Sequence, residues 1–181
     1  SGWCSWYYYY TRVSAEHDLY IALVESIVSQ QLSVKAAATI YGRLCALFPG
    51  HRPDPERLAA MDTATLRGVG LSRQKADYVR HVARFALGGG LDRRRIDALP
   101  NEEVIAHLTQ IKGVGRWTVE MTMMFCLERP DVFAPDDLGL QNAMKKLYRL
   151  KSKGPALRRR LQKIAHPWHP HQTLACLYLW K

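Results

Sequence analysis

Two adjacent carboxylates, Asp136 and Asp137, follow Pro135 at the start of a segment whose pattern is helical through Leu147. Proline suits the first turn of a helix, and the positive end of the helix dipole favours a carboxylate there. We expect Asp136 to cap the helix and Asp137 to lie in its first turn. A fixed carboxylate can stabilise a positively charged, sugar-like transition state and orient a water molecule. Asp137 is therefore the candidate catalytic residue, and helix initiation is the alternative role of both aspartates.

Two glycine turns of the same form, at residues 67–70 and 112–115, join predicted helices. Glycine readily adopts positive φ and lets the backbone approach a partner closely, so such a turn can present main-chain amides to a phosphate. Glycine also connects helices for geometric reasons alone, which is the interpretation we favour for residues 67–70. The turn at 112–115 is the candidate phosphate site.

Basic charge is concentrated in one part of the sequence. The 181 residues carry 26 lysines and arginines against 16 acidic residues, a net charge of +10. Residues 1–137 are balanced, whereas residues 138–181 hold ten basic and no acidic side chains. Lysine and arginine contacts with phosphates release condensed counterions, so this pattern favours a nucleic acid partner. A solvated basic surface without a partner is the alternative.

The residue pattern predicts an all-α fold. Apolar residues recur at helical spacing from Leu19 to Val28, whereas the alternation typical of strands is nearly absent. Ser33, Ser72 and Asn101 are placed to cap helices, because their side chains can accept hydrogen bonds from the free amides of a first turn. The predicted helices cover residues 19–28, a segment that opens at Ser33 in a unit closed by Gly50, Pro53 and Pro55, then residues 63–68, 72–87, 101–108, 117–127, 136–147, a basic segment from 155, and 173–180.

The length and the cysteine pattern limit the class of protein. A chain of 181 residues is large enough to bury the core of one globular unit. Its four cysteines include no CxxC pair, so we expect neither a zinc ribbon nor an iron–sulfur cluster. No stretch reaches the roughly 18 apolar residues of a membrane span, and no secretory signal opens the chain. We expect an intracellular protein, cytoplasmic (nucleoid) if bacterial, with no membrane partner.

Several separated motifs resemble one enzyme family. The motifs are Ile27–Ala37, Gly70–Ala76, the hairpin Leu108–Thr118, the segment 131–137, and the closing Tyr178–Trp180. Their order and spacing are similar to those of the helix-hairpin-helix (HhH-GPD) DNA glycosylases. Within that superfamily they resemble the alkylbase branch, 3-methyladenine DNA glycosylase II, and the resemblance covers about residues 19–180.

The resemblance implies a single glycosylase unit over residues 1–181, with the active cleft between two helical lobes. One lobe covers about residues 34–133 and contains the hairpin. The other joins about residues 1–33 to 134–181. We expect the compact form of the family, without an N-terminal β-rich domain. The sequence shows no coiled-coil pattern, so a monomer is the default.

The resemblance also implies an activity. Family members hydrolyse the N-glycosidic bond of alkylated purines, such as 3-methyladenine and 7-methylguanine, flipped out of duplex DNA, which is the first step of base excision repair. The catalytic aspartate of the family aligns with Asp137. Bifunctional members use a lysine just after the hairpin to form a Schiff base, and here that position is Trp117, which cannot form an imine. We expect a monofunctional enzyme without lyase activity or catalytic cofactor, acting on duplex DNA that contains damaged bases.

The same resemblance assigns the remaining site residues. Trp117, Trp180, Gln30 and Met121 align with the base pocket, where aromatic walls bind a cationic purine by stacking and cation–π attraction. Gln31 and Leu32 align with the wedge that fills the gap left by the flipped base. The residues that align with the phosphate contacts of the family are Lys112, Gly113, Gly115, Trp117 and Thr118. A structural Na⁺ or K⁺ would be bound by the backbone carbonyls of Thr109, Ile111 and Val114.

Two other functions are compatible with these residues. Met121 occupies a position where the alkylbase branch often has tyrosine, which makes a glycosylase for deaminated or oxidised purines conceivable. A non-catalytic helix-hairpin-helix DNA-binding module would use the same hairpin and the same basic surface. The aromatic-rich residues 1–10 receive no function from either their pattern or the resemblance.

Overall fold

The computed structural model describes residues 18–181, and every regular element in that range is a helix. The all-α prediction is therefore confirmed. The elements are α2 (Leu19–Ser29), α3 (Val34–Cys45), the short η2 (Pro49–His51), α4 (Pro55–Ala60), α5 (Thr63–Gly68), α6 (Arg73–Leu87), α7 (Arg93–Asp97), α8 (Asn101–Leu108), α9 (Arg116–Phe125), α10 (Leu138–Tyr148), α11 (Gly154–Ala165), the short η3 (His166–Trp168) and α12 (Gln172–Leu179).

Side-chain caps fix where most of these helices begin. Ser33 and Ser72 cap α3 and α6 as predicted, since their hydroxyls accept the amides of Ala36 and Lys75. The predicted Asn101 cap is wrong, because Asn101 is already helical and its side-chain amide donates to the Asp131 carbonyl at 2.7 Å. Helix α9 also ends at Phe125, earlier than the predicted boundary at residue 127.

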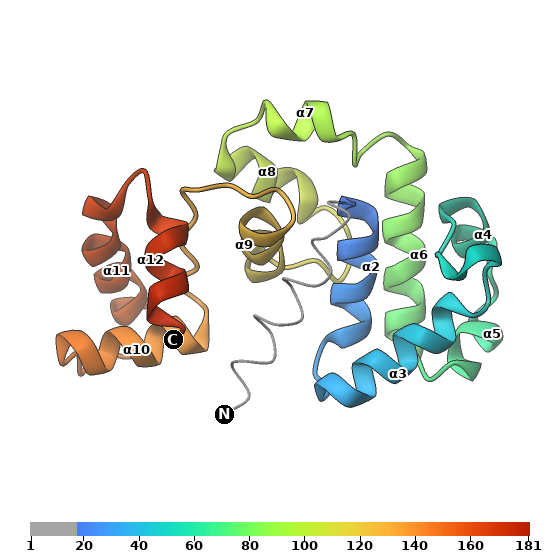
Figure 1. Ribbon diagram of the computed structural model, residues 1–181, viewed down its shortest axis with the longest axis horizontal. Coiled ribbons are helices and arrows are strands. Elements are labelled where there is room, and N and C mark those ends of the chain that lie inside the picture. The colour runs from blue at the N-terminus through green and yellow to red at the C-terminus, as the bar shows by residue number, and fades with distance from the viewer. Residues whose placement is uncertain (1–17) are drawn as a thin grey trace.

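The helices form two lobes (Figure 1). In the larger lobe α2 packs against α3, α6 and α9. The sequence predicts that residues 1–33 pack with the C-terminal helices, and this prediction is wrong for α2. Residues 1–17, to which the same prediction applies, lie outside the described residues. The physical reason is burial, since Leu23, Val24, Ile27 and Val28 are fully enclosed in the core of the larger lobe.

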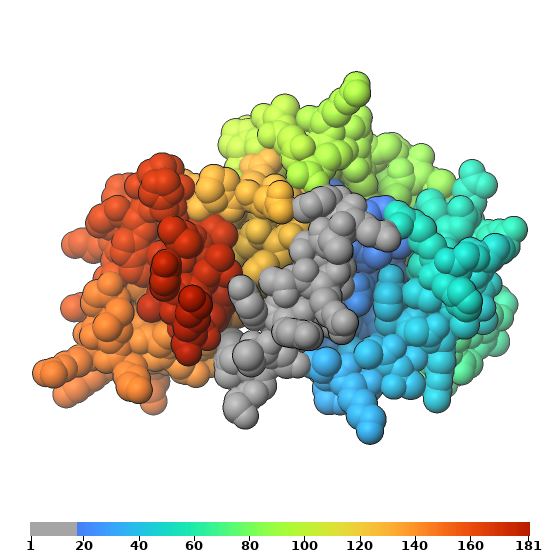
Figure 2. Space-filling view, in the orientation of Figure 1, coloured from blue at the N-terminus to red at the C-terminus, as the bar shows by residue number. Residues whose placement is uncertain are grey.

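The smaller lobe consists of α10, α11 and α12 and occupies one end of the molecule (Figure 2). Met144, Leu157 and Leu161 form a second apolar cluster between its helices. None of the helices formed by residues 18–181 has the length and apolar character needed to span a bilayer.

The segment that links α9 to α10 is held in place from both lobes. The Thr173 hydroxyl in α12 accepts the Val132 amide at 3.0 Å and donates to the Arg129 carbonyl at 2.6 Å. The Arg129 guanidinium reaches back into the larger lobe and donates to the carbonyls of Leu99 and Ile96. These bonds fix the position of the residues immediately before Asp137.

Candidate active site

Asp137 is the N-cap of α10. Its Oδ1 accepts the Leu140 amide at 2.9 Å, and the residue is only 4% exposed. The expectation that Asp136 caps this helix is wrong by one position. Asp136 is exposed and pairs with Arg158 at 3.1 Å instead. The capping bond and burial hold the Asp137 carboxylate at the positive end of α10.

Two tryptophans hold the same carboxylate from different directions. The Trp117 indole N–H donates to Oδ2 of Asp137 at 3.0 Å, and the Trp180 indole N–H donates to Oδ1 at 2.9 Å. Trp117 lies in the first turn of α9, and Trp180 is the C-cap of α12. The structure thus brings together the three residues that the sequence predicts as catalytic aspartate and pocket aromatics. The indole donors were not predictable, because they depend on contacts between residues far apart in the chain.

The aromatic surroundings of the carboxylate continue beyond the two indoles. The Trp180 ring stacks on Phe125 with 5.9 Å between ring centroids. Met121 lies one turn after Trp117 on α9 but is only 3% exposed, in the core of the larger lobe. Its contribution to a base pocket stays a prediction.

The second glycine turn has a conformation that depends on one glycine. Gly113 has φ of +90°, and a Cβ at this position would lie 2.2 Å from the Tyr78 ring. No side chain therefore fits here unless the Tyr78 ring or the hairpin moves. Gly115 is the N-cap of α9 and provides no side-chain cap, so the first amides of α9 carry no capping hydroxyl or carboxylate.

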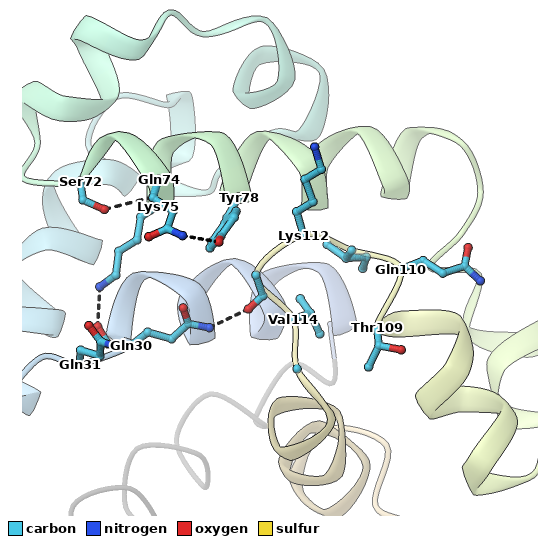
Figure 3. Close-up of a pocket in the computed structure, with 13 residues that line it drawn as sticks. Gln30, Gln31, Ser72, Gln74, Lys75, Tyr78, Thr109, Gln110, Lys112 and Val114 are labelled. Atoms are coloured by element: carbon cyan, nitrogen blue, oxygen red, sulfur yellow. Dashed lines mark hydrogen bonds between the residues drawn. The ribbon is translucent and has the colours of Figure 1, made fainter.

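An open groove of about 580 Å³ joins this hairpin to the turn after α2 (Figure 3). It brings the wedge candidate Gln31 and the pocket candidate Gln30 beside the hairpin, while Leu32 is half-buried in the same turn. From the hairpin it includes Thr109, Ile111, Lys112, Gly113, Val114 and Gly115. The predicted phosphate and ion ligands therefore lie together, with the exception of residues 117 and 118.

The side chain of Thr118, a predicted phosphate contact, is buried. It is only 5% exposed, and it lies on the face of α9 that packs into the protein. Its side chain is therefore not available to a phosphate, and the predicted contact would have to come from its backbone amide in the first turn of α9, which stays a prediction. The indole N–H of the neighbouring Trp117 donates to Asp137, whereas its predicted phosphate contact would be made by the backbone amide and stays a prediction.

A buried carboxyl that the sequence did not single out lies one turn after Trp117. Glu120 is 1% exposed, and its Oε1 accepts from Arg116 Nε at 2.9 Å. Its Oε2 has no hydrogen-bond partner among residues 18–181. The Arg116 guanidinium is shared between two carboxylates, because it also donates to Glu102 at 3.0 Å. Burial is the main cause that raises the pKa of Glu120 to about 7, against an opposing effect of Arg116.

This carboxyl makes the stability depend on pH. The folded protein keeps the Glu120 proton up to a pKa of about 7, whereas an exposed glutamate loses it near 4.5. The contribution of this raised pKa to the free energy of unfolding is complete below pH 4.5. It decreases by about 3 kcal/mol as the pH rises to 7. We expect urea unfolding between pH 5 and 8 to show this loss in the wild type and a smaller one in Glu120→Gln. Equal losses in the two proteins would contradict this role of Glu120.

Comparison with known proteins identifies the family of the chain. Residues 24–169 match the HhH-GPD superfamily of base excision DNA repair proteins. The chain belongs to this superfamily. The matched HhH-GPD region includes α9, the hairpin before it and Asp137.

Individual HhH-GPD relatives are similar over most of the chain. DNA-3-methyladenine glycosylase 1 of Schizosaccharomyces pombe is 37% identical over 174 residues, which cover 94% of this chain and 75% of the relative. A solved structure of the S. pombe 3-methyladenine DNA glycosylase in complex with abasic DNA has a TM-score of 0.76 and covers 90% of this chain and 79% of that one. DNA-3-methyladenine glycosidase of Bacillus halodurans is 44% identical with a TM-score of 0.79, covering 89% and 73%.

Proposed function

We propose that this protein is a monofunctional DNA glycosylase that hydrolyses the N-glycosidic bond of alkylated purines in duplex DNA. The observation that carries the proposal is the Asp137 carboxylate, which is buried and held on both oxygens by the indoles of Trp117 and Trp180. The relatives named as 3-methyladenine DNA glycosylases support the same substrate class, and the abasic DNA bound by one of them supports DNA as the partner. The site of action would be intracellular.

The chemistry assigns a separate role to each group. When the bond between sugar and base breaks, the electron pair leaves with the base and C1′ of the sugar becomes positive. An N-alkylated purine is already cationic, so it departs as a neutral base without an acid. The Asp137 carboxylate stabilises the sugar cation, and it orients the attacking water and accepts its proton. Aromatic walls at Trp117 and Trp180 favour the cationic base.

The position after the hairpin supports hydrolysis over strand cleavage. Trp117 stands there, and its indole nitrogen donates to Asp137. An indole cannot form the Schiff base that strand cleavage requires. The product would be an abasic site in an otherwise continuous strand.

The hairpin groove would hold the DNA backbone. Gly113 and Gly115 amides and Lys112 would contact a phosphate, while Gln31 and Leu32 enter the duplex as the base leaves. Gln31 is suited to this because it is exposed and holds φ of +58° at the tip of its turn. The excess of lysine and arginine in residues 138–181 adds non-specific attraction to the polyanion.

We also propose a structural Na⁺ or K⁺ at the hairpin, bound by the carbonyls of Thr109, Ile111 and Val114. The three residues line one groove, and the Ile111 carbonyl, which accepts the Val114 amide at 3.0 Å, retains a second lone pair. Replacing Na⁺ and K⁺ with choline at constant ionic strength is expected to weaken duplex binding several-fold, measured by fluorescence anisotropy. Unchanged affinity in choline would contradict the ion site.

The decisive experiment uses duplex DNA that contains 7-methylguanine or 3-methyladenine. We expect free methylated purine by chromatography, with strand breaks only after alkali. Breaks before alkali would overturn the monofunctional assignment. Parallel duplexes with deaminated or oxidised purines test the other lesion classes. Tight DNA binding without release of any base would leave a non-catalytic binding module.

We expect the hydrogen bond from the Trp180 indole to Asp137 to contribute measurably to the rate of base release. In Trp180→Phe the ring that stacks on Phe125 is kept, but the N–H that holds Oδ1 of Asp137 is lost. Because a hydrogen bond to a charged group contributes about 1.5–3 kcal/mol, we expect base release to slow by about 10- to 100-fold in single-turnover assays. Trp168→Phe is the matched control, since that ring packs edge-on against Phe133. Equal rates for the two variants would refute the role of the indole N–H.

A further inference from the structure

Lys75 lies in the first turn of α6, but its side chain serves a different helix. Its ammonium donates to the Val28 carbonyl at 2.7 Å and to the Gln30 carbonyl at 2.6 Å. Both carbonyls lie at the C-terminal end of α2, where helix carbonyls lack partners and a positive charge is favoured. Figure 3 shows the side chain reaching from α6 to the turn after α2.

This interaction fixes the turn that carries the wedge candidates. Gln30 caps α2, and Gln31 follows with φ of +58°, a conformation that costs free energy for a residue other than glycine. The Lys75 ammonium holds the carbonyls on the N-terminal side of this strained residue. Partial burial lowers the pKa of Lys75, so the side chain gives up hydration to make these two bonds.

A second bond connects the same turn to the hairpin. The Gln30 side-chain amide donates to the Gly113 carbonyl at 2.8 Å. Gly113 in turn lies against the Tyr78 ring, one turn of α6 after Lys75, and the Tyr78 hydroxyl accepts from Gln74 at 2.6 Å. One face of α6 therefore supports both the turn after α2 and the hairpin.

We propose that Lys75 is a positioning residue that holds the wedge turn in a fixed relation to the phosphate-binding hairpin. The inference rests on the proposed function. The hairpin fixes the phosphate backbone, and the wedge must then enter the duplex at a set distance from it. Lys75 lies behind both and acts through Gln30. Its effect falls on the opening of the base pair and not on the breaking of the glycosidic bond.

The test separates these two steps with paired substrates. Lys75→Met is expected to lower single-turnover excision of 7-methylguanine from a fully paired duplex by about 10-fold or more. The same lesion in single-stranded DNA, or in an unpaired bulge, needs little or no opening, and there the loss is expected to be threefold or less. Fluorescence of 2-aminopurine placed beside the lesion is expected to show less flipping in the variant. Equal losses on paired and unpaired substrates would overturn the positioning role.

Two further variants keep the result interpretable. Arg73→Met removes one positive charge from the same turn of α6, at an exposed side chain outside the groove, and is expected to change the paired-to-unpaired ratio less than twofold. Lys75→Arg keeps donors for the two carbonyls and is expected to recover most of the paired-duplex rate. If Lys75→Arg behaves like Lys75→Met, the proposal is wrong. Absence of base release by the wild-type protein on every substrate would instead refute the proposed function.

Discussion

Replacing Asp137 with asparagine is expected to lower release of methylated purine by about 10²- to 10³-fold. The asparagine keeps the size of the side chain and can still accept the Leu140 amide through one oxygen. It loses the charge that stabilises the sugar cation. Because Leu140 and Trp180 donate to the same oxygen, an asparagine that keeps the cap presents its N–H₂ group to the indole N–H of Trp117 in place of the second oxygen.

The matched control is Asp136→Asn. Asp136 is the neighbouring aspartate, but it is exposed and pairs with Arg158. We therefore expect the Asp136→Asn protein to release methylated purine at a rate within about twofold of wild type. Single-turnover rates on a 7-methylguanine duplex, with circular dichroism to verify folding, compare the two variants. Similar rates for both would remove Asp137 from the chemistry. Duplex affinity of Asp137→Asn should not fall, because the change removes a negative charge near DNA.

Gly113→Ala is expected to have the second large effect. A methyl group at residue 113 would lie 2.2 Å from the Tyr78 ring, and φ of +90° is unfavourable for alanine. We expect a loss of stability of about 3 kcal/mol and a duplex affinity lower by about 10-fold or more, since the Tyr78 ring or the hairpin must move and the unfavourable φ remains. Urea unfolding and fluorescence anisotropy measure the two quantities.

Gly115→Ala provides the comparison within the same hairpin. Gly115 has φ of −93°, and a Cβ there meets no atom within 4 Å, so its stability should change by less than about 1 kcal/mol. Adding Tyr78→Ala to Gly113→Ala removes the clash but not the unfavourable φ, so it should recover only part of the affinity. A stable Gly113→Ala protein that binds DNA normally would refute the requirement for glycine.

The types of the site residues were predictable from the sequence, whereas their contacts were not. Asp137, the hairpin and the two tryptophans stand in motifs that occupy short, continuous segments. The indole bonds to Asp137 join residues 20 and 43 positions apart, and no local pattern encodes such a pairing. The role of Lys75 is hidden in the same way, because its partners are backbone carbonyls 45 and 47 positions away.

The fold shows a similar division. Long helices with a clear apolar period, such as α6 and α10, were found near their true bounds. Helices α4 and α7 have six and five residues, which is less than two turns and too short for a period to appear, whereas the equally short α5 was predicted from the glycine turn that ends it. Helix α2 was predicted in the wrong lobe, because the spacing of its apolar residues identifies the face that is buried but not the helices that cover it.

The indole donors at Asp137 come from different lobes, since Trp117 belongs to α9 and Trp180 follows α12. The hairpin and the turn after α2 lie wholly within the larger lobe. Partial unfolding that separates the smaller lobe would part Asp137 and Trp180 from Trp117 and leave the DNA-binding groove assembled. Mild denaturant would therefore turn the protein into a DNA-binding module that hydrolyses nothing, at concentrations below those that abolish binding.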